Sequence, residues 1–250
     1  MRAEATLRPY RKDHDHSYTI GVFPTLELLA HRPERVTRVL VSSRGEANEG
    51  VAKICTLCAE RGIPVVVADR QVARLAGNEK SYVVAAFAKY EAPLDAAANH
   101  VLLVNPSDAG NLGTIIRTML GFDLTNLAIV TPAVDLFAPR TLRAAMGATF
   151  QLAFEHFDAI DAYRARFGRR LYPLMTDGEV DLSEAGFRSP YTLIFGPEGA
   201  GLGPEYHALG TSVRIPQSGR IDSLNLAVSV GIALYAATHQ EEQDAAGAGG

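Results

Sequence analysis

The sequence lacks several features that mark particular classes of protein. No run of 18 or more apolar residues occurs among the 250 residues, and the N-terminus lacks the apolar stretch of a signal peptide. We therefore expect a cytoplasmic protein with no membrane contact. A hydrophobic content of 47% with 21% charged residues argues against disorder and allows a sizeable core. The length suits one large domain or two ordinary ones.

Cysteine is scarce, and its scarcity argues against a metal centre. Cys55 and Cys58 have the C-x-x-C spacing of some metal and redox sites, but no second pair follows. We interpret both as residues on one side of a helix, where a reduced cysteine behaves as a small buried hydrophobe. His14 and His16 flank Asp15 in a polar segment, residues 1–18, which we expect to be a flexible, solvated arm. The sequence therefore predicts no metal site.

The chain also lacks an excess of positive charge. Its net charge of −4 argues weakly against a nucleic-acid partner, but the two halves differ. Residues 1–95 carry 14 basic and 12 acidic side chains, whereas residues 96–250 carry 10 and 16. A phosphate-binding surface is therefore expected in the first half, where Arg32, Arg35, Arg38 and Arg44 lie close in sequence. A solvated charged face explains the same residues equally well.

Helix and strand patterns divide the chain into two parts. A small α/β domain is predicted over residues 1–95, followed by a proline-containing linker at 91–99 and a boundary near residue 96. Apolar strands separated by helical patterns then predict a parallel α/β domain over residues 96–240. The expected strands of this second domain are 101–104, 127–130, 171–175, 191–195 and 213–215.

The last predicted helix, residues 223–237, is apolar around almost its whole circumference. A helix of this kind has to be enclosed, and a second subunit could supply part of the enclosure. The remaining tail, residues 241–250, is rich in alanine and glycine, and we expect it to be disordered.

Three glycine-, asparagine- and proline-rich turns occur beside apolar runs in the second domain, at residues 105–118, 195–202 and 215–225. Open α/β sheets bind ligands outside the carboxyl ends of their strands, so these turns predict one composite pocket. Glycine exposes bare backbone against which a flat heterocycle can lie, which favours an adenosine-bearing ligand.

A nicotinamide dinucleotide is an alternative ligand. The glycines at 196–203 are followed about twenty residues later by Asp222, as in a dinucleotide fingerprint. However, Pro197 and Pro204 leave little room for a helix to open on a pyrophosphate. The fingerprint also normally lies in the first βαβ unit rather than near the end of the chain.

The same turns resemble a known family. Residues 111–118 (NLGTIIRT), 196–202 (GPEGAGL) and 215–235, with SLNLAVSVGIALY at its end, resemble in order and spacing the three motifs of SpoU-type (TrmH-like) RNA 2′-O-ribose methyltransferases of the SPOUT superfamily. The resemblance covers about 98–240. It implies an α/β fold with a parallel sheet and a deep trefoil knot, a homodimer, and S-adenosylmethionine as cofactor. Residues 19–90 resemble, more loosely, the ribosomal-protein-like RNA-binding domain of many members.

The resemblance also implies roles for individual residues. The matching catalytic positions are Arg117, Asn111, Glu198, Ser223 and Asn225. The cofactor would contact Thr176, Gly196, Gly199, Ile215 and Leu224. Because a guanidinium has a pKa of about 12.5 to 13.8, Arg117 is expected to act as a cation that stabilises a developing alkoxide or holds a phosphate that takes the proton. Asn111 and Asn225 would orient substrate and loop, and Glu198 would brace its turn or hold Arg117.

The predicted function is the S-adenosylmethionine-dependent methylation of a ribose 2′-oxygen in structured rRNA or tRNA. The alternative is a catalytically silent RNA-binding or ribosome-assembly protein with the same fold. The acidic second half suggests this alternative, as do residues 78–84 (NEKSYVV), where relatives usually carry a His-Gln-Gly turn. The presence of Asn111, Arg117 and Glu198 favours the enzyme.

Overall fold

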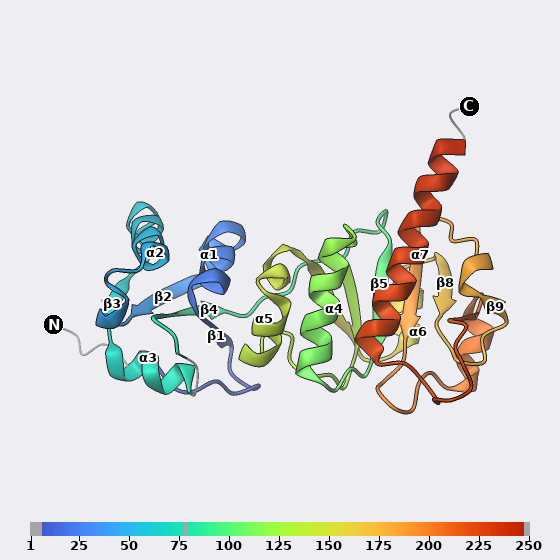
Figure 1. Cartoon of the computed structure of the whole chain (residues 1–250), viewed down its shortest axis with the longest axis horizontal. Coiled ribbons are helices and arrows are strands. Elements are labelled where there is room, and N and C mark those ends of the chain that lie inside the picture. The colour runs from blue at the N-terminus through green and yellow to red at the C-terminus, as the bar shows by residue number, and fades with distance from the viewer. Residues whose placement is uncertain (1–6, 78–79, 248–250) are drawn as a thin grey trace. The chain divides into compact units, whose positions relative to one another are not determined.

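The chain, shown in Figure 1 as a computed structural model describing residues 7–77 and 80–247, divides into two compact units. Unit 1 consists of residues 1–90 and 135–151, and unit 2 of residues 91–134 and 152–250. The chain first passes from unit 1 into unit 2 between residues 90 and 91, close to the boundary expected near residue 96. The later segment 135–151 differs from expectation, because it packs in unit 1 although it lies within the expected second domain in sequence.

Unit 1 is built on a four-stranded sheet with the order β1-β4-β2-β3. β4 (Val83–Ala88) runs antiparallel to both β1 (His16–Ile20) and β2 (Val36–Val41), and β2 pairs in parallel with β3 (Val65–Val67). Helices α1 (Val22–His31) and α2 (Glu49–Glu60) lie on one side of this sheet and α3 (Asp69–Ala76) on the other (Figure 1). Short 3-10 turns, η1 (Pro33–Arg35) and η2 (Ser43–Gly45), follow α1 and β2.

The segment 135–151 joins unit 1 through aromatic packing. It contains α5 (Pro139–Ala145) and the 3-10 turn η3 (Ala148–Gln151). The ring of Phe87 on β4 meets Phe137 and Phe150 edge to face at centroid distances of 5.5 and 5.6 Å. Burying these large rings against the sheet explains why the segment leaves the fold of unit 2.

The N-terminal segment is packed where the sequence predicts a solvated arm. The Tyr18 hydroxyl donates to the Arg8 carbonyl at 2.5 Å, and the Leu7 amide donates to Gln71 Oε1 at 3.1 Å. Leu7 and Tyr10 pack against a buried cluster that includes Tyr18. Burial of these apolar side chains holds residues 7–15 on the sheet, and β1 begins at His16. Residues 1–6 of the expected arm lie outside the described residues.

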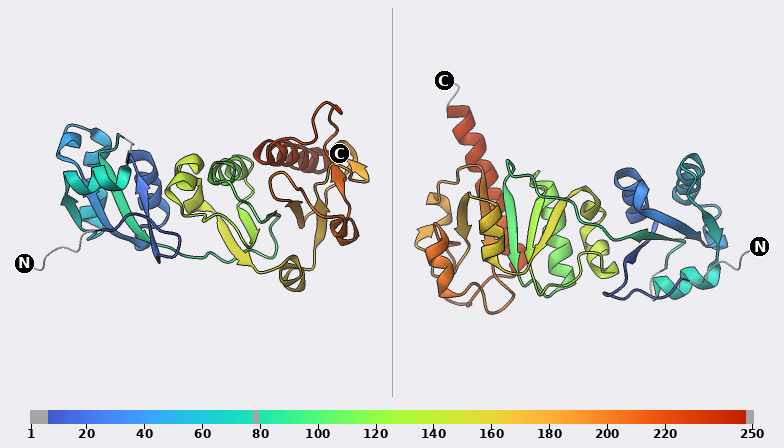
Figure 2. Two further views of the ribbon diagram at one scale, coloured as in Figure 1. Left: turned by 90° about the horizontal axis from the view of Figure 1, so that it is seen from below. Right: turned by 180° about the vertical axis from the view of Figure 1, so that it is seen from behind.

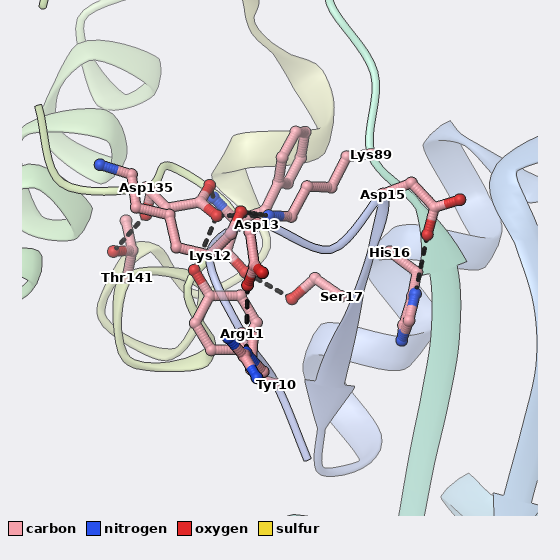
Figure 3. A network of polar contacts seen from close by, with 11 residues as sticks. Tyr10, Arg11, Lys12, Asp13, Asp15, His16, Ser17, Lys89, Asp135 and Thr141 are labelled. Carbon is pink, nitrogen blue, oxygen red and sulfur yellow. Dashed lines mark hydrogen bonds and ion pairs between the residues drawn. The ribbon is translucent and has the colours of Figure 1, made fainter. Parts of the chain in front are cut away.

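A polar network connects three segments of unit 1 (Figure 3). Oδ2 of Asp135 accepts from the Lys89 ammonium at 2.5 Å and from the Tyr10 hydroxyl at 2.6 Å. The Lys89 ammonium also donates to the carbonyl of Lys12 at 2.8 Å, and the Phe137 amide donates to Oδ1 of Asp135 at 2.8 Å. The network therefore fastens the N-terminal segment and the end of β4 to the segment 135–151.

Unit 2 contains a five-stranded sheet in which every strand pairs in parallel, as predicted. The order is β7 (Ala153–Phe157), β6 (Asn126–Val130), β5 (His100–Val104), β10 (Tyr191–Phe195) and β8 (Arg170–Pro173). A small second sheet pairs β9 (Val180–Asp181) with β11 (Val213–Arg214), so the strand expected at 213–215 lies outside the main sheet. The short turns η4 (Leu182–Glu184) and η5 (Pro204–Leu209) connect these strands.

Helices cover both faces of the sheet of unit 2. Helices α4 (Ala109–Gly121) and α7 (Leu226–Gly247) lie side by side on one face, and α6 (Ile160–Arg166) lies on the other (Figures 1 and 2). On the α6 side, Tyr163 and Phe167 pack with Leu102, Ala128 and Ile194 of the central strands. The core of unit 2 therefore lies on both sides of β5, β6 and β10.

Helix α7 is covered on one face within this chain. Its buried stripe includes Ala227, Val230 and Leu234, whereas Val228, Ile232 and Tyr235 are 50%, 37% and 59% exposed. The complete enclosure expected from the sequence is therefore not provided by the described part of one chain. The helix continues to Gly247, into the tail expected to be disordered, and residues 248–250 lie outside the described residues. No helix within the described ranges has the combination of length and apolarity needed to cross a bilayer.

The cysteines and the histidines of the N-terminal segment have ordinary structural surroundings. Cys58 is buried on α2, where burial raises the pKa of its thiol to about 11, and Cys55 is half-buried. His16 contacts Asp15 Oδ1 at 2.9 Å and the Tyr18 hydroxyl at 3.1 Å. Over residues 7–77 and 80–247, no group of three or more potential metal-binding side chains is present.

Candidate functional site

The glycine-rich turns of unit 2 meet at one cavity of about 640 Å³. Its walls come from the segments after β8 and β10, from β11 and the loop after it, and from the first turns of α4 and α7. This is the composite pocket that the sequence predicts. The predicted site residues that line it are Asn111, Thr176, Gly196, Glu198, Gly199, Ile215, Ser223, Leu224 and Asn225.

The loop after β10 depends on glycine. A Cβ atom on Gly196 would lie 2.4 Å from the carbonyl carbon of Gly201 and 2.5 Å from the amide nitrogen of Leu202. Any side chain there would push this returning backbone away. Gly199 has a φ of +88°, in the left-handed region that residues with side chains rarely adopt. The loop can therefore present bare backbone to the cavity.

A chain of hydrogen bonds joins the three motifs. The Asn225 amide donates to Asn111 Oδ1 at 3.1 Å, and the Asn111 amide donates to Glu198 Oε1 at 3.3 Å. The other carboxylate oxygen, Oε2, accepts from the Ser107 hydroxyl at 2.9 Å and from the Ser107 backbone amide at 3.1 Å. Residues more than a hundred positions apart in sequence are thus held in one network.

Helix caps fix the orientation of the two asparagines. Asn225 Oδ1 accepts from the backbone amides of Ala227 at 2.9 Å and Val228 at 3.3 Å, so it caps the N-terminus of α7. Its amide group is thereby directed to Asn111. At the start of α4, Asp108 Oδ1 accepts from the Asn111 backbone amide at 2.8 Å. The first turns of both helices are therefore held at the cavity wall.

Glu198 is held as a carboxylate. Burial alone would raise its pKa, but its own backbone amide, the two donors of Ser107 and the amide of Asn111 outweigh that effect and lower the pKa below the usual value. Around neutral pH the carboxylate therefore accepts hydrogen bonds and does not donate a proton. Its hydrogen-bond partners among the described residues, Ser107, Asp108 and Asn111, brace the turn, and Arg117 is not one of them.

Arg117 is the predicted site residue that the structure places elsewhere. It lies exposed on α4 and does not line the cavity. Six residues of α-helix turn a side chain by about 240° and advance it by about 9 Å, so Arg117 and Asn111 occupy different faces of α4. The motif spacing alone does not show this, because it counts residues and not the direction in which they point.

Other residues of the site were missed from the sequence. Asp177 and Gln217 line the cavity, and Asp222, considered only for a dinucleotide, lines it as well. Behind the wall, His207 Nδ1 lies 3.0 Å from the Ser212 hydroxyl and its Nε2 lies 3.3 Å from Asp177 Oδ2. The position of Asp177 directly after Thr176 could have indicated it. Nothing in the sequence pattern indicates His207.

Comparison with known families identifies the class to which this fold and site belong. Residues 98–235 match the model of the SpoU rRNA methylase family, and residues 18–93 match that of the RNA 2′-O ribose methyltransferase substrate-binding domain. Since the first match covers more than half of the sequence, the chain belongs to the SpoU rRNA methylase family.

Individual relatives agree with this assignment. The chain is 29% identical over 196 residues to the 23S rRNA (adenosine(1067)-2′-O)-methyltransferase of Streptomyces azureus, covering 74% of this chain and 73% of that protein. An uncharacterized tRNA/rRNA methyltransferase of Synechocystis is 32% identical over 145 residues, which are 56% of this chain and 53% of that protein. The chain thus spans about half the length of this second relative.

A solved structure shows the same fold. The AdoMet-bound rRNA methyltransferase from Sinorhizobium meliloti is 26% identical and superimposes with a TM-score of 0.77 over 90% of this chain and 87% of that one. The likeness extends over both units, so unit 1 as well as unit 2 follows the known fold.

Proposed function

We propose that the protein transfers a methyl group from S-adenosylmethionine to a ribose 2′-oxygen of structured RNA, in rRNA or tRNA. The observation that carries the proposal is the network from Asn225 through Asn111 to Glu198, which joins all three motifs at one glycine-lined cavity. The names of related proteins, which include 23S rRNA 2′-O-methyltransferases, favour rRNA.

The cavity has the properties that S-adenosylmethionine requires. The backbone at Gly196 and Gly199 is free of side chains, as a flat adenine ring needs, and Ile215 and Leu224 supply apolar contact. Thr176 and Asp177 add polar groups at the end of β8. We assign cofactor binding to Thr176, Gly196, Gly199, Ile215 and Leu224. The bound cofactor would supply an electrophilic sulfonium methyl group.

The polar residues of the site would place the nucleophile. Asn111 and Asn225 have fixed amide orientations and would orient the ribose against the cavity, with Ser223 at its rim. Glu198 would keep the motif 1 and motif 2 turns together through its hydrogen bonds. These residues would hold the reacting groups in line. A cation is still required to stabilise the negative charge that develops on the 2′-oxygen as it loses its proton.

A second copy of the chain would supply that cation. Arg117 lies outside its own cavity on α4, which lies beside α7 with its exposed Val228, Ile232 and Tyr235. An exposed apolar stripe of this kind is typical of a subunit interface. In the proposed homodimer, the partner subunit's Arg117 stabilises the developing alkoxide or holds an adjacent phosphate that takes the proton of the 2′-hydroxyl. The loops after β10 and before α7 would form the trefoil knot, which their shared cavity wall supports.

Ribose-methylation maps of rRNA and tRNA from cells with and without this gene test the function. We expect one ribose position to lose its methyl group in the deletion strain and to regain it on complementation. Unchanged maps would overturn the proposal. Calorimetric titration with S-adenosylmethionine separates the silent RNA-binding alternative, because such a protein need not bind the cofactor.

A further inference from the structure

Two arginines of unit 1 surround a single buried tyrosine. The guanidinium carbon of Arg32 lies 5.4 Å from the centroid of the Tyr90 ring, and that of Arg35 lies 5.2 Å from it. Tyr90 is only 8% exposed and is itself packed against Phe137 at a centroid distance of 5.0 Å. Both cations are therefore held by cation–π contact to a ring that cannot easily move.

The charge of this pair is poorly compensated. Arg35 forms an ion pair with its sequence neighbour Glu34 at 3.6 Å, where the two side chains are 41% and 58% exposed. Arg32 has no ion pair within the described residues, and the Nε atoms of both arginines are buried without a hydrogen-bond partner there. Burial raises the pKa of Tyr90, whereas the positive charges of Arg32 and Arg35 oppose the rise. Two like charges thus lie at one ring, where the exposed carboxylate of Glu34 pairs with Arg35.

We propose that Arg32, Arg35 and Tyr90 form a binding site for the phosphodiester backbone of the RNA substrate, which we call the arginine pair site. The inference rests on the proposed function and identifies the surface of unit 1 that would bind the RNA backbone. A guanidinium presents a planar fork of donors that matches phosphate oxygens, and a ring that holds the fork in place reduces the entropy lost on binding.

The site divides the arginine cluster that the sequence indicates. Arg32 and Arg35 follow α1 at one end of the sheet, whereas Arg44 lies in η2 beyond the other end of the six-residue strand β2. A six-residue strand is about 20 Å long, so Arg44 does not belong to the arginine pair site. The contact would position RNA without reading its sequence, because phosphates carry no sequence information.

Binding of deproteinised 23S rRNA to the full-length protein tests the site. The R32Q/R35Q variant should raise the Kd about tenfold at moderate salt, and should reduce the slope of log Kd against log salt by about 1.5, from two lost phosphate contacts. The matched control R61Q/R70Q removes two exposed arginines of unit 1 and should change Kd less than about twofold. R32K/R35K, which keeps the charge but loses the fork, should fall between wild type and R32Q/R35Q.

The outcomes separate this inference from the proposed function. The S-adenosylmethionine affinity of R32Q/R35Q should match that of the wild type, and thermal melting shows whether the variant is folded at the assay temperature. R32K/R35K keeps the test valid if the first variant unfolds. If a folded R32Q/R35Q variant binds RNA with the affinity and salt dependence of the wild type, the arginine pair site is wrong. The proposed ribose methylation by the wild type is not affected by that result. An equal loss in R61Q/R70Q would also overturn it. Failure of the wild type to bind either 23S rRNA or total tRNA would overturn both.

Discussion

At the scale of single residues, Glu198 holds the site together. Its carboxylate accepts from Ser107 and Asn111, and through Asn111 it reaches Asn225 on the third motif. A hydrogen bond to a charged acceptor contributes roughly 1.5–3 kcal/mol, which is more than a neutral hydrogen bond contributes. The geometry of the proposed active site therefore depends on one ionised side chain.

Replacing Glu198 by glutamine should weaken cofactor binding. In Glu198→Gln the amide group would turn a donor toward the donors of Ser107 or Asn111, so the turns would separate. We expect the Kd for S-adenosylmethionine to rise about tenfold, as for the loss of one charged hydrogen bond, measured by calorimetry. Glu184→Gln, at an exposed position of the same unit, should leave it unchanged. Equal Kd values for the wild type and Glu198→Gln would contradict this role.

The pH dependence of stability follows from the same carboxylate. Because the pKa of Glu198 in the folded protein lies below its ordinary value of 4.5, the group favours folding at every pH above that value. The contribution disappears as the pH falls from 4.5 through the lowered pKa. The difference in unfolding free energy between the wild type and Glu198→Gln should therefore be constant from pH 7 to 5 and shrink below pH 4.5, in denaturant titrations. A difference that grew toward low pH would contradict the assignment.

The pattern of turns predicted the cavity, and the family resemblance predicted most of the residues that line it, but neither predicted the direction in which each side chain points. Asn111, Glu198 and Asn225 each follow an apolar run at a turn, and the structure brings them together. Arg117 belongs to the same motif as Asn111, but the rotation of α4 over the six positions from one to the other places Arg117 on another face of the helix. Ser107 and His207 contact the site through Glu198 and Asp177, which are distant from them in sequence. A single sequence does not reveal such contacts.

At the scale of elements, the packing of α4 on α7 leaves room at Gly231. A Cβ on this helical glycine would meet Thr118 Cγ2 at 3.7 Å, an ordinary van der Waals contact. Gly231→Ala should therefore stabilise the protein by about 0.5–1 kcal/mol through helix propensity, seen as a higher Tm. Gly196→Ala is the contrasting variant, since its Cβ would lie 2.4 Å from the Gly201 backbone and should disrupt the loop. A lower Tm for Gly231→Ala would show that the two helices are closer than described.

The elements best predicted from sequence were the central ones. The strands β5, β6 and β10 are mostly apolar and buried along their whole length, and each was expected. The edge strand β7 was not, because its burial is broken by half-buried and exposed positions. The strand at Val213 was expected in the main sheet, but it pairs with β9. A strand of two residues is too short for its sequence pattern to predict which strand it pairs with.

At the scale of the whole molecule, the chain order conceals how the units are built. The segment 135–151 was expected in the second domain, but Phe137 and Phe150 pack on Phe87 of unit 1, and Asp135 is held by Lys89. The sequence shows that these rings are apolar and not which core they enter. The two compact units therefore do not follow one another in simple chain order.

The proposed homodimer predicts that two inactive variants restore each other. Arg117→Ala should lose turnover but keep its affinity for S-adenosylmethionine, because the contact belongs to the transition state. Asn111→Ala should be impaired in its own cavity. If the partner subunit's Arg117 completes each site, hybrid dimers of the two variants contain one intact site, and mixed samples should regain measurable activity. Separate samples of each variant are the control. No recovery in confirmed hybrid dimers would place Arg117 in its own site or outside catalysis.

The central claim is that the three turns around the cavity carry methyl transfer to ribose. Purified protein, incubated with methyl-labelled S-adenosylmethionine and RNA from cells lacking the gene, should produce label that elutes with 2′-O-methylated nucleosides after complete digestion. Glu198→Gln should reduce that label and Glu184→Gln should not. Label recovered in methylated bases, or no label from a protein that binds the cofactor, would contradict the account.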